Sequence, residues 1–513
     1  MKLGLWIGAA IGAVALYVLS HVWAALKSPL RSIPGPWIAR FSDIWYFAAV
    51  QRRGQTFQET SKRLHHQHGP IVRYGPRRFS FNDPEAAKII YSHTRQFPKS
   101  SWYDAWRRPE GHNSFADRDI KRHASERKLF QSTYSLSSLV AYEPHVNLCG
   151  DLLTQRLDEL IGQSPHRAGA VLNLGHWLQC YAFDVISSIT YGRRWGFLDA
   201  GEDVDGLMAA LDSRNYYAFV VGIYASLHPY LLPLRNRWMA WRGAGDVDAL
   251  IGFTQRQMAV LQEGEEADYN EESSGLGREP SFLAKFCRRH LEKPDAMPMA
   301  SLVSMCLVNM AAGSDTTGIS LSACIFYLLK NPGCLDHLRA EVDAAAQDNP
   351  DHLPFNVTQN MPYLQAVIKE ALRLHPAVAM PLERVVPQGG ATIADKFFPE
   401  GTIVGVNPWV QHRNRAVFGQ DADEFNPSRW LSEDKERVAL MTRSWMPFGM
   451  GTRTCIGRHI SHLEISKLVP RLVRDFDFSL AGGLEQPGAT WRMDNGWFAK
   501  QRGFMVAVKR RQR

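Results

Sequence analysis

The chain has 513 residues, of which 45% are hydrophobic and 21% are charged. This composition supplies material for a large core and excludes a disordered, a collagen-like or a small disulfide-stapled protein. The net charge of +8 is mild for this length; it suits a membrane surface or an acidic partner, and we expect no nucleic-acid partner.

The first expected element is an apolar run from Leu3 to Leu26 without a formal charge. As a helix it would reach about 36 Å, enough to cross a hydrocarbon core of about 30 Å. A secretory signal peptide is the alternative, but its apolar stretch usually has about 7–15 residues. Lys2 precedes the run, while Lys27 and Arg31 follow it, which keeps the bulk of the chain in the cytoplasm. We therefore expect a single-pass anchor and linker over residues 1–32 and one domain over 33–513.

The rest of the chain reads as mainly helical with a smaller β-rich part, a mainly α (α+β) fold. Most of residues 140–375 have apolar residues at three- and four-residue spacings, which predicts helices. Short alternating stretches at 71–74 and 402–406 predict strands. The segment Glu263 to Pro280 is polar and predicts an exposed loop within the domain.

One predicted helix is unusually long, from Met297 to Lys330, where Asn331-Pro332 ends it. Its middle, residues 311–318, reads Ala-Ala-Gly-Ser-Asp-Thr-Thr-Gly, a cluster of weak helix formers inside an apolar helix. Such a break in a local rule often marks function. A kink made by Ser and Thr side chains that bond back to the helix is an equally good explanation.

Cys455 is the only one of the seven cysteines in unusual surroundings, the segment Phe-Gly-Met-Gly-Thr-Arg-Thr-Cys-Ile-Gly at 448–457. The other six are expected to be buried as small apolar residues, and the odd count without a Cys-x-x-Cys pair argues against disulfides or a structural zinc. The glycines predict a tight loop, and Arg453 with nearby backbone amides would favour the thiolate. The helix predicted after it, ended or kinked by Pro470, adds its dipole. A single sulfur ligand indicates a preformed metal cofactor, namely haem.

With Phe448, Gly451, Arg453, Cys455 and Gly457 in this spacing, the chain resembles the cytochrome P-450 haem-thiolate monooxygenases over roughly residues 33 to 505. The resemblance implies the fold of that family and haem as cofactor, with Cys455 as the axial iron ligand. It also implies that Glu370 and Arg373 form a buried structural cluster with the arginine of Phe-Asn-Pro-Ser-Arg-Trp at 425–430, where Ser428 replaces the usual acidic residue.

The resemblance also gives the middle of the long helix a function. Gly313 would let the helix approach the haem and open a notch for dioxygen. Asp315 and Thr316 would supply protons for its reduction. The haem propionates would be held by Arg453, Arg384, His123 and Arg127, where His123 stands in the place of a common tryptophan; a solvated helical histidine is the alternative for His123.

Several segments align with regions that line substrate pockets in this family, and their apolar character indicates a lipophilic substrate. Any one of these aromatic residues is more often core than pocket, and Asn309 is the one candidate polar anchor. The residues are Trp102, Tyr103, Trp106, Phe115, Val308, Asn309, Ala312, Val378, Ala379, Met380, Trp497 and Phe498.

The segments Gly-Pro-Arg-Arg at 75–78 and Phe-Pro-Lys-Ser-Ser-Trp-Tyr at 97–103 are similar to fungal microsomal members such as pisatin demethylase. This likeness implies natural-product biosynthesis at the endoplasmic reticulum membrane. Because the chain has no flavin or nicotinamide fingerprint, electrons would come from NADPH through a separate cytochrome P-450 reductase. The alternatives are a haem-thiolate isomerase, dehydratase or peroxygenase on the same fold, and a noncatalytic haem sensor or binding protein.

Overall fold

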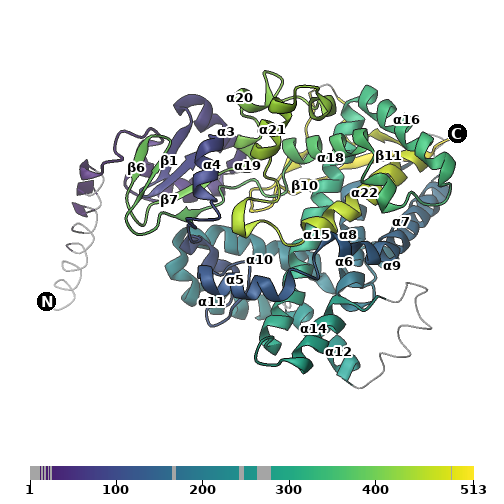
Figure 1. Ribbon diagram of the computed structural model, residues 1–513, viewed down its shortest axis with the longest axis horizontal. Helices are drawn as coiled ribbons and strands as arrows, with labels where there is room; N and C mark the ends of the chain where they lie inside the picture. The colour runs from purple at the N-terminus through teal and green to yellow at the C-terminus, as the bar shows by residue number, and fades with distance from the viewer. Residues whose placement is uncertain are drawn as a thin grey trace.

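The computed structural model describes residues 12, 16, 19, 20, 22, 23, 26–52, 54–164, 169–241, 248–262, 279–486 and 488–512. Most of the predicted anchor and of the loop predicted at 263–280 therefore lies outside the described residues. As the sequence predicts, the body is mainly helical with small sheets (Figure 1).

The β-rich part combines the early chain with residues 384–406. Its four-stranded sheet has the order β1-β2-β7-β4, with β2 and β7 parallel and the other two pairs antiparallel, and β5 and β6 form a separate pair. Phe79 and Phe81 of β2 both pack on Phe398 of β6. The elements are η1 (Trp37–Arg40), α2 (Ile44–Gln51), α3 (Phe57–His68), β1 (Ile71–Gly75), β2 (Arg78–Phe81), α4 (Pro84–Ile90), β4 (Arg384–Val385), β5 (Ala391–Ile393), β6 (Lys396–Phe398) and β7 (Ile403–Val406).

The helical core is built around α15, which runs through the middle of the body (Figure 1). It packs most extensively against α8, and α18 and α22 also pack against it. The core helices are α7 (Glu143–Gln163), α8 (Leu174–Tyr191), α15 (Met299–Lys330), α16 (Pro332–Asp348), α17 (Phe355–Thr358), α18 (Pro362–Leu374) and α22 (Arg458–Asp475).

Shorter elements cover this core. A second sheet, ordered β3-β11-β8, joins the C-terminus to residues 170–173. The covering elements are η2 (Ser101–Trp106), α5 (Ile120–Phe130), α6 (Leu136–Leu139), η3 (Val140–Tyr142), α9 (Phe197–Ala200), η4 (Val204–Gly206), α10 (Leu207–Val221), η5 (Gly222–Leu227), α11 (His228–Trp241), α12 (Asp248–Gln262) and α14 (Phe282–Glu292). The remaining elements are β3 (Ala170–Asn173), α19 (Pro408–Gln411), α20 (Arg415–Phe418), η6 (Pro427–Leu431), α21 (Lys435–Ser444), η7 (Gly451–Arg453), β8 (Phe476–Leu480), β9 (Arg492–Met493), β10 (Gln501–Arg502) and β11 (Met505–Arg510).

Two glycines of α15 set how closely it approaches α8. A Cβ atom at Gly313 would lie 2.9 Å from Ile186 Cγ1, and one at Gly318 would lie 3.2 Å from Gln179 Cα. Gly313 thus has a packing role against α8, in addition to the notch for dioxygen, which stays a prediction. The Ser and Thr side chains of this stretch do bond back to the helix, for example Ser314 Oγ to Met310 O at 2.7 Å, yet α15 continues unbroken to Lys330.

The expectation that Pro470 ends the helix after Cys455 is wrong, because α22 continues through Pro470 to Asp475, and a kink there stays a prediction. Proline inside a helix costs about 3 kcal/mol. Here Leu468, Val469, Leu472 and Val473 are all buried in the main core, and burial of such side chains contributes about 1.5–3 kcal/mol each. Packing on both sides of the proline therefore outweighs the local cost.

Candidate active site

Cys455 lies in a tight loop between α21 and α22. Gly449 and Gly451 have positive φ angles of 72° and 68°, and a Cβ at Gly451 would lie 2.1 Å from Tyr91 O, so only glycine fits this position. The backbone N–H of Cys455 donates to Phe448 O at 2.9 Å, while the Phe448 ring packs against the main core. The signature residues thus define one loop that fixes the place of the sulfur.

The electrostatics at the sulfur differ from the sequence expectation. Backbone amides of Gly457 and Arg458, at the start of α22, and the guanidinium groups of Arg127 and Arg458 lower the pKa of the Cys455 thiol, but burial is the larger effect and the net shift is upward. Arg453 is not among these groups, so the cation assigned to it is supplied by Arg127 and Arg458. A ligand that binds the thiolate must therefore supply positive charge of its own, as a metal ion does.

Cys455 is nevertheless exposed, unlike Cys149, Cys180, Cys306 and Cys324, which are buried. A sulfur that is crowded by protein atoms and still accessible is available for ligation. Thr317 and Ser461, whose hydroxyl oxygens lie 3.1 Å apart, connect the middle of α15 to α22 just beyond this loop. The sulfur donor and its accessibility fit a haem iron.

Four basic side chains of the described residues gather near the loop. Burial and then Arg384 and Arg453 hold the pKa of Lys99 well below its usual value. Burial, followed by Arg453 and Lys99, lowers the pKa of His123 to about 3, and burial followed by Arg384 lowers the pKa of Arg453 to about 10. Asp117 is the acidic group that acts on this cluster. We call Lys99, His123, Arg384 and Arg453 the cationic cluster.

The cationic cluster fits carboxylate groups such as the haem propionates. Arg453 Nη1 is buried and has no hydrogen-bond partner among the described residues, and a buried charge of this kind is costly unless an anion pairs with it. Arg384 and Arg453 line a pocket of about 250 Å³. His123 is only 6% exposed, so the alternative of a solvated histidine is wrong. The sequence does not predict a role for Lys99, because nothing in its own segment indicates that it lies close to Arg384 and Arg453.

Arg127 contacts the cysteine loop directly. Its Nη1 donates to Thr454 O at 2.8 Å, directly before Cys455, and its charge acts on the sulfur. It therefore supports the cysteine loop, and its contact with a propionate stays a prediction.

Asp315 and Thr316 are neighbours in sequence but have different surroundings. Thr316 Oγ1 donates to Ala312 O at 2.7 Å, and Ala312 is exposed although it lies within the central helix. Asp315 is 2% exposed, and its Oδ1 accepts from Gln179 Nε2 at 2.6 Å and from Lys500 Nζ at 3.1 Å. Burial raises the pKa of Asp315, and Lys500 opposes that rise. The carboxyl and the hydroxyl are thus held by separate partners.

The predicted structural cluster of Glu370, Arg373 and Arg429 is present and buried. Glu370 accepts from Arg373 Nε at 2.8 Å, Arg429 Nε at 2.9 Å and Trp430 Nε1 at 2.9 Å. Ser428 stands where the family pattern has an acidic residue. Asp421 provides the carboxylate instead, and its Oδ2 lies 2.9 Å from Arg429 Nη2. We call Glu370, Arg373, Arg429 and Asp421 the compensated cluster.

A short path joins the compensated cluster to the cysteine loop through His412. Arg373 Nη1 donates to His412 O at 2.7 Å, and His412 Nδ1 lies 3.0 Å from Arg373 O. The other ring nitrogen of His412 accepts from Met446 N–H at 2.8 Å. Burial and Arg373 lower the pKa of His412 to about 3, so the ring stays neutral and can accept this bond.

Most of the predicted substrate-contacting residues form one apolar cluster. Trp102, Tyr103, Met380 and Trp497 are buried in it, with Trp106, Phe115, Val378 and Phe498 packed against them; the ring centroids of Trp102 and Trp497 are 4.8 Å apart. Asn309 accepts from Tyr134 Oη at 2.6 Å and donates to Thr190 Oγ1 at 3.4 Å. Both polar ends of Asn309 are therefore already engaged within the protein.

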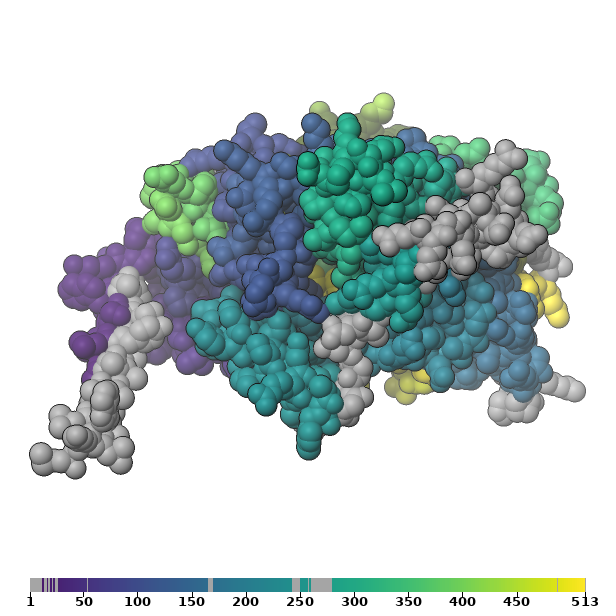
Figure 2. Space-filling view, turned by 90° about the horizontal axis from the view of Figure 1, so that it is seen from below, coloured from purple at the N-terminus to yellow at the C-terminus, as the bar shows by residue number. Residues whose placement is uncertain are grey.

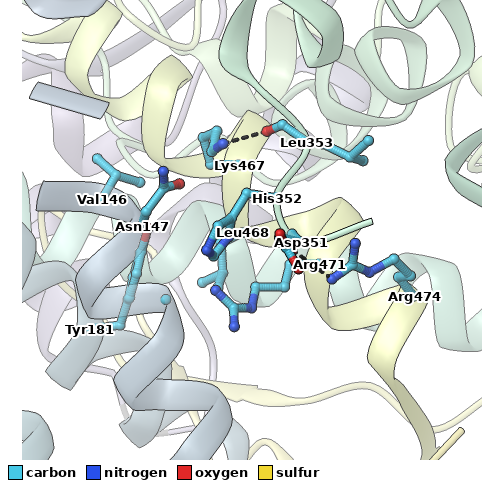
Figure 3. Close-up of a pocket in the computed structure, with 11 residues that line it drawn as sticks. Val146, Asn147, Tyr181, Asp351, His352, Leu353, Lys467, Leu468, Arg471 and Arg474 are labelled. Atoms are coloured by element: carbon cyan, nitrogen blue, oxygen red, sulfur yellow. Dashed lines mark hydrogen bonds between the residues drawn. The ribbon is translucent and has the colours of Figure 1, made fainter. Parts of the chain in front are cut away.

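A pocket of about 370 Å³ lies between α7, α8, α22 and residues 351–353 (Figure 3). Its three cations are paired: Lys467 with Glu143 at 2.6 Å, Arg471 with Asp151, and Arg474 with Asp475 at 2.9 Å. None of the residues predicted from the sequence lines it. This charge-balanced pocket is not the candidate active site.

Comparison with known proteins agrees with this geometry. The family model described as Cytochrome P-450 matches residues 39–496. A pisatin demethylase of Fusarium vanettenii is 37% identical over 490 residues, which cover 96% of this chain and 91% of that protein. Cytochrome P-450 monooxygenase cicH of Emericella nidulans is 36% identical over 507 residues, 97% of each chain. A cytochrome P-450 monooxygenase of Aspergillus terreus is 37% identical over 476 residues, 91% of this chain and 94% of that protein.

The family model covers most of the chain, and these relatives are similar over nearly its full length. The family brings a haem-thiolate cofactor, which the accessible Cys455 and the cationic cluster suit. The chain belongs to the cytochrome P-450 family and is a haem-thiolate monooxygenase.

Proposed function

We propose that this protein is a membrane-anchored monooxygenase that inserts one oxygen atom from dioxygen into a lipophilic small molecule of fungal natural-product biosynthesis. Electrons come from NADPH through a separate cytochrome P-450 reductase. The observation that carries the catalytic assignment is the accessible Cys455 in its glycine loop beside the cationic cluster. Relatives named as monooxygenases of Emericella nidulans and Aspergillus terreus support the fungal setting.

When bound, haem supplies the iron at which dioxygen is reduced. Cys455 would hold its iron through the thiolate, while the cationic cluster would neutralise its propionates. The compensated cluster holds the cysteine loop through His412 and Met446. Asp315 and Thr316 would supply protons: the Thr316 hydroxyl donates to Ala312 O, and burial raises the pKa of the Asp315 carboxyl, which favours its protonated form. Gly451 lets the loop approach the backbone of Tyr91, and Gly457 lies beside the sulfur.

The membrane assignment rests on the N-terminal run and on exposed apolar side chains of the body. The described residues of the run are helical, and Leu16 and Trp23 among them are exposed. Trp37 is 71% exposed, and the Phe47 and Tyr224 rings join this part of the chain to η5, with centroids 6.1 Å apart. A row of exposed residues then follows along α11: Tyr230, Leu231, Leu234, Trp238 and Trp241.

The residues from Val204 to Trp241 are, among those described, the stretch long and apolar enough to cross a membrane. However, the chain bends at Tyr224, and α10 packs on η2, so this stretch belongs to the body. The lobe of α10 and α11 projects in teal at the lower edge of Figure 2. We propose that it touches the lipid surface while the N-terminal run spans the endoplasmic reticulum membrane once, with the catalytic domain in the cytoplasm.

The ligand assignment is tested by the spectrum of the reduced protein with carbon monoxide. Wild type is expected to show the red-shifted Soret band of thiolate ligation, and Cys455→Ser is expected to lose it completely. Cys334→Ser, which changes a half-buried cysteine, is the matched control and should keep the band. An unchanged spectrum in Cys455→Ser would contradict the assignment.

The reaction is tested by turnover in vesicles with reductase and NADPH, compared with peroxide alone. Extracts of a gene-deletion strain supply the candidate substrates, since accumulated metabolites are enriched in the true one. Product formed only with NADPH, reductase and dioxygen supports the proposal. Product formed with peroxide alone would favour a peroxygenase, and product formed without any oxidant would favour an isomerase or dehydratase.

A further inference from the structure

A chain of alternating charges runs from Asp315 to the protein surface. Asp315 Oδ1 lies 3.1 Å from Lys500 Nζ, which lies 2.8 Å from Asp212 Oδ1. Asp212 Oδ2 lies 3.0 Å from Arg502 Nη2, and Arg502 Nε lies 2.7 Å from Asp494 Oδ2. The exposed fractions of these side chains rise in the same order: 2%, 14%, 28%, 39% and 55%. Each step outward is therefore more solvated than the one before.

Two donors converge on one oxygen of Asp315 and leave the other one free. Oδ1 accepts from Lys500 and from Gln179 Nε2 at 2.6 Å, while the buried Oδ2 has no partner among the described residues. Gln179 belongs to α8, which packs closely on α15 at Gly318. A Cβ atom added at Gly318 would lie only 3.2 Å from Gln179 Cα, so the missing side chain of Gly318 leaves room for α8. The carboxyl group is thus held from two sides in one orientation.

The charged groups that act on Asp315 come from three directions. Lys500 and Arg502 belong to the C-terminal segment and favour its charged form, while Asp212 of α10 disfavours it. From α8 comes the neutral Gln179. Burial raises the pKa of Asp315 more than Lys500 lowers it. Lys500 therefore limits this rise and makes the carboxyl easier to deprotonate.

We propose that Gln179 and Lys500 are positioning residues for Asp315, and that the charge chain through Asp212, Arg502 and Asp494 sets when Asp315 gives up its proton. This inference rests on the proposed catalytic role of Asp315. In one cycle Asp315 loses one proton toward the interior and regains one from solvent, so that the charge chain ends each cycle unchanged. The distant C-terminal segment and α10 thereby regulate the central helix.

The first test compares Lys500→Met and Gln179→Leu with the conservative Lys500→Arg. Because general acid catalysis contributes about 10²–10⁴-fold, we expect NADPH-supported product formation to fall roughly tenfold or more in Lys500→Met. The pH–rate profile should move to higher pH, since the pKa of Asp315 rises without its cation, and Lys500→Arg should restore most of both. Gln179→Leu should lower the rate with a smaller pH shift. An unmoved profile in Lys500→Met overturns the proposal.

The second test needs no turnover. Because Asp315 is harder to ionise without Lys500, the melting temperature of the holoprotein should fall more steeply with rising pH in Lys500→Met than in wild type. In an Asp315→Asn background, Lys500→Met should no longer make the melting temperature fall more steeply with rising pH. A slope that persists in that background overturns the proposal. Failure of wild type to form product would instead count against the proposed function, while this cycle would still test the charge chain.

Arg511→Met is the matched control for both tests. Arg511 also belongs to the C-terminal segment and pairs with Asp343 at 2.7 Å, away from Asp315. Its removal should leave the pH–rate profile and the slope of melting temperature with pH unchanged, and the carbon monoxide spectrum should be intact in every variant. A shift in Arg511→Met equal to that in Lys500→Met would show a general effect of lost charge and overturn the proposal.

Discussion

The compensated cluster and the cationic cluster each contain two arginines, but within the described part of the chain only the arginines of the compensated cluster are paired with carboxylates. In the first, Glu370 and Asp421 are bonded to the two arginines at distances near 2.9 Å. In the second, burial and neighbouring cations lower the pKa values of Lys99, His123 and Arg453, and Arg453 Nη1 has no partner among the described residues. A buried charge is tolerated when it is paired. The first cluster therefore stabilises the fold, and the second one has positive charge available to bind an anion.

The largest expected effect is on the compensated cluster. Glu370→Gln would leave Arg373 and Arg429 without their shared carboxylate, so we expect a loss of about 3–5 kcal/mol in the free energy of unfolding. Denaturant unfolding of the haem-bound protein measures it. Glu85→Gln is the control, since Glu85 pairs with Lys88 at the surface and such pairs contribute about 0–1 kcal/mol. Equal losses of unfolding free energy in the two variants would contradict the claim that the buried cluster stabilises the fold more than a surface ion pair does.

The cationic cluster should respond in the opposite sense. Lys99→Met removes a buried cation, so the haem-free protein should be no less stable than wild type. Haem should dissociate about tenfold faster, because a charge-assisted contact contributes about 1.5–3 kcal/mol. Transfer of haem to apomyoglobin measures the rate, and Lys62→Met, at a surface pair with Asp423, is the control. Lost stability with unchanged haem retention would place Lys99 in the scaffold.

His123 provides a pH test of the same cluster. Its pKa in the folded protein is about 3 against 6.5 as the ordinary value, so the unfolded chain binds the extra proton first. Its contribution to stability is therefore present above pH 6.5 and is lost as the pH falls toward 3. His123→Gln should weaken the fall in stability over this window, measured by unfolding between pH 7 and 4. Bound haem should also weaken it, because propionates raise the pKa of His123. A window unaffected by haem would separate His123 from the propionates.

The smallest effect is expected at Ser428, where the family usually has an acid. Ser428→Asp adds a carboxylate beside Arg429, which Asp421 already pairs. Since position 428 is exposed, we expect a change of about 0–1 kcal/mol in the free energy of unfolding. In an Asp421→Asn background the same substitution should stabilise more. Equal effects in the two backgrounds would mean that Asp421 does not replace the missing acid.

Local sequence patterns predicted much of the fold and part of the site. Apolar spacing predicts a long helix from Met297 to Lys330, and α15 runs from Met299 to Lys330, because proline and apolar spacing act over a few residues. The glycine loop around Cys455 was predicted for the same reason. Pro470 shows the limit, since packing of α22 on the core overrides a local helix breaker. Lys99, Asp421, His412 and Lys500 were missed because their partners lie far away in sequence or carry no motif.

The sequence by itself determined the class of the protein: an apolar run at the start, a long helix with a polar centre, and ten residues around Cys455 that predict a haem thiolate. Only the tertiary structure decided which charges are paired. It placed Asp421 beside Arg429, Arg127 beside Thr454, and Lys500 beside Asp315. The physical reason is range: backbone propensity and turn geometry act between near neighbours, whereas pairing and burial of charge depend on segments that only folding brings together.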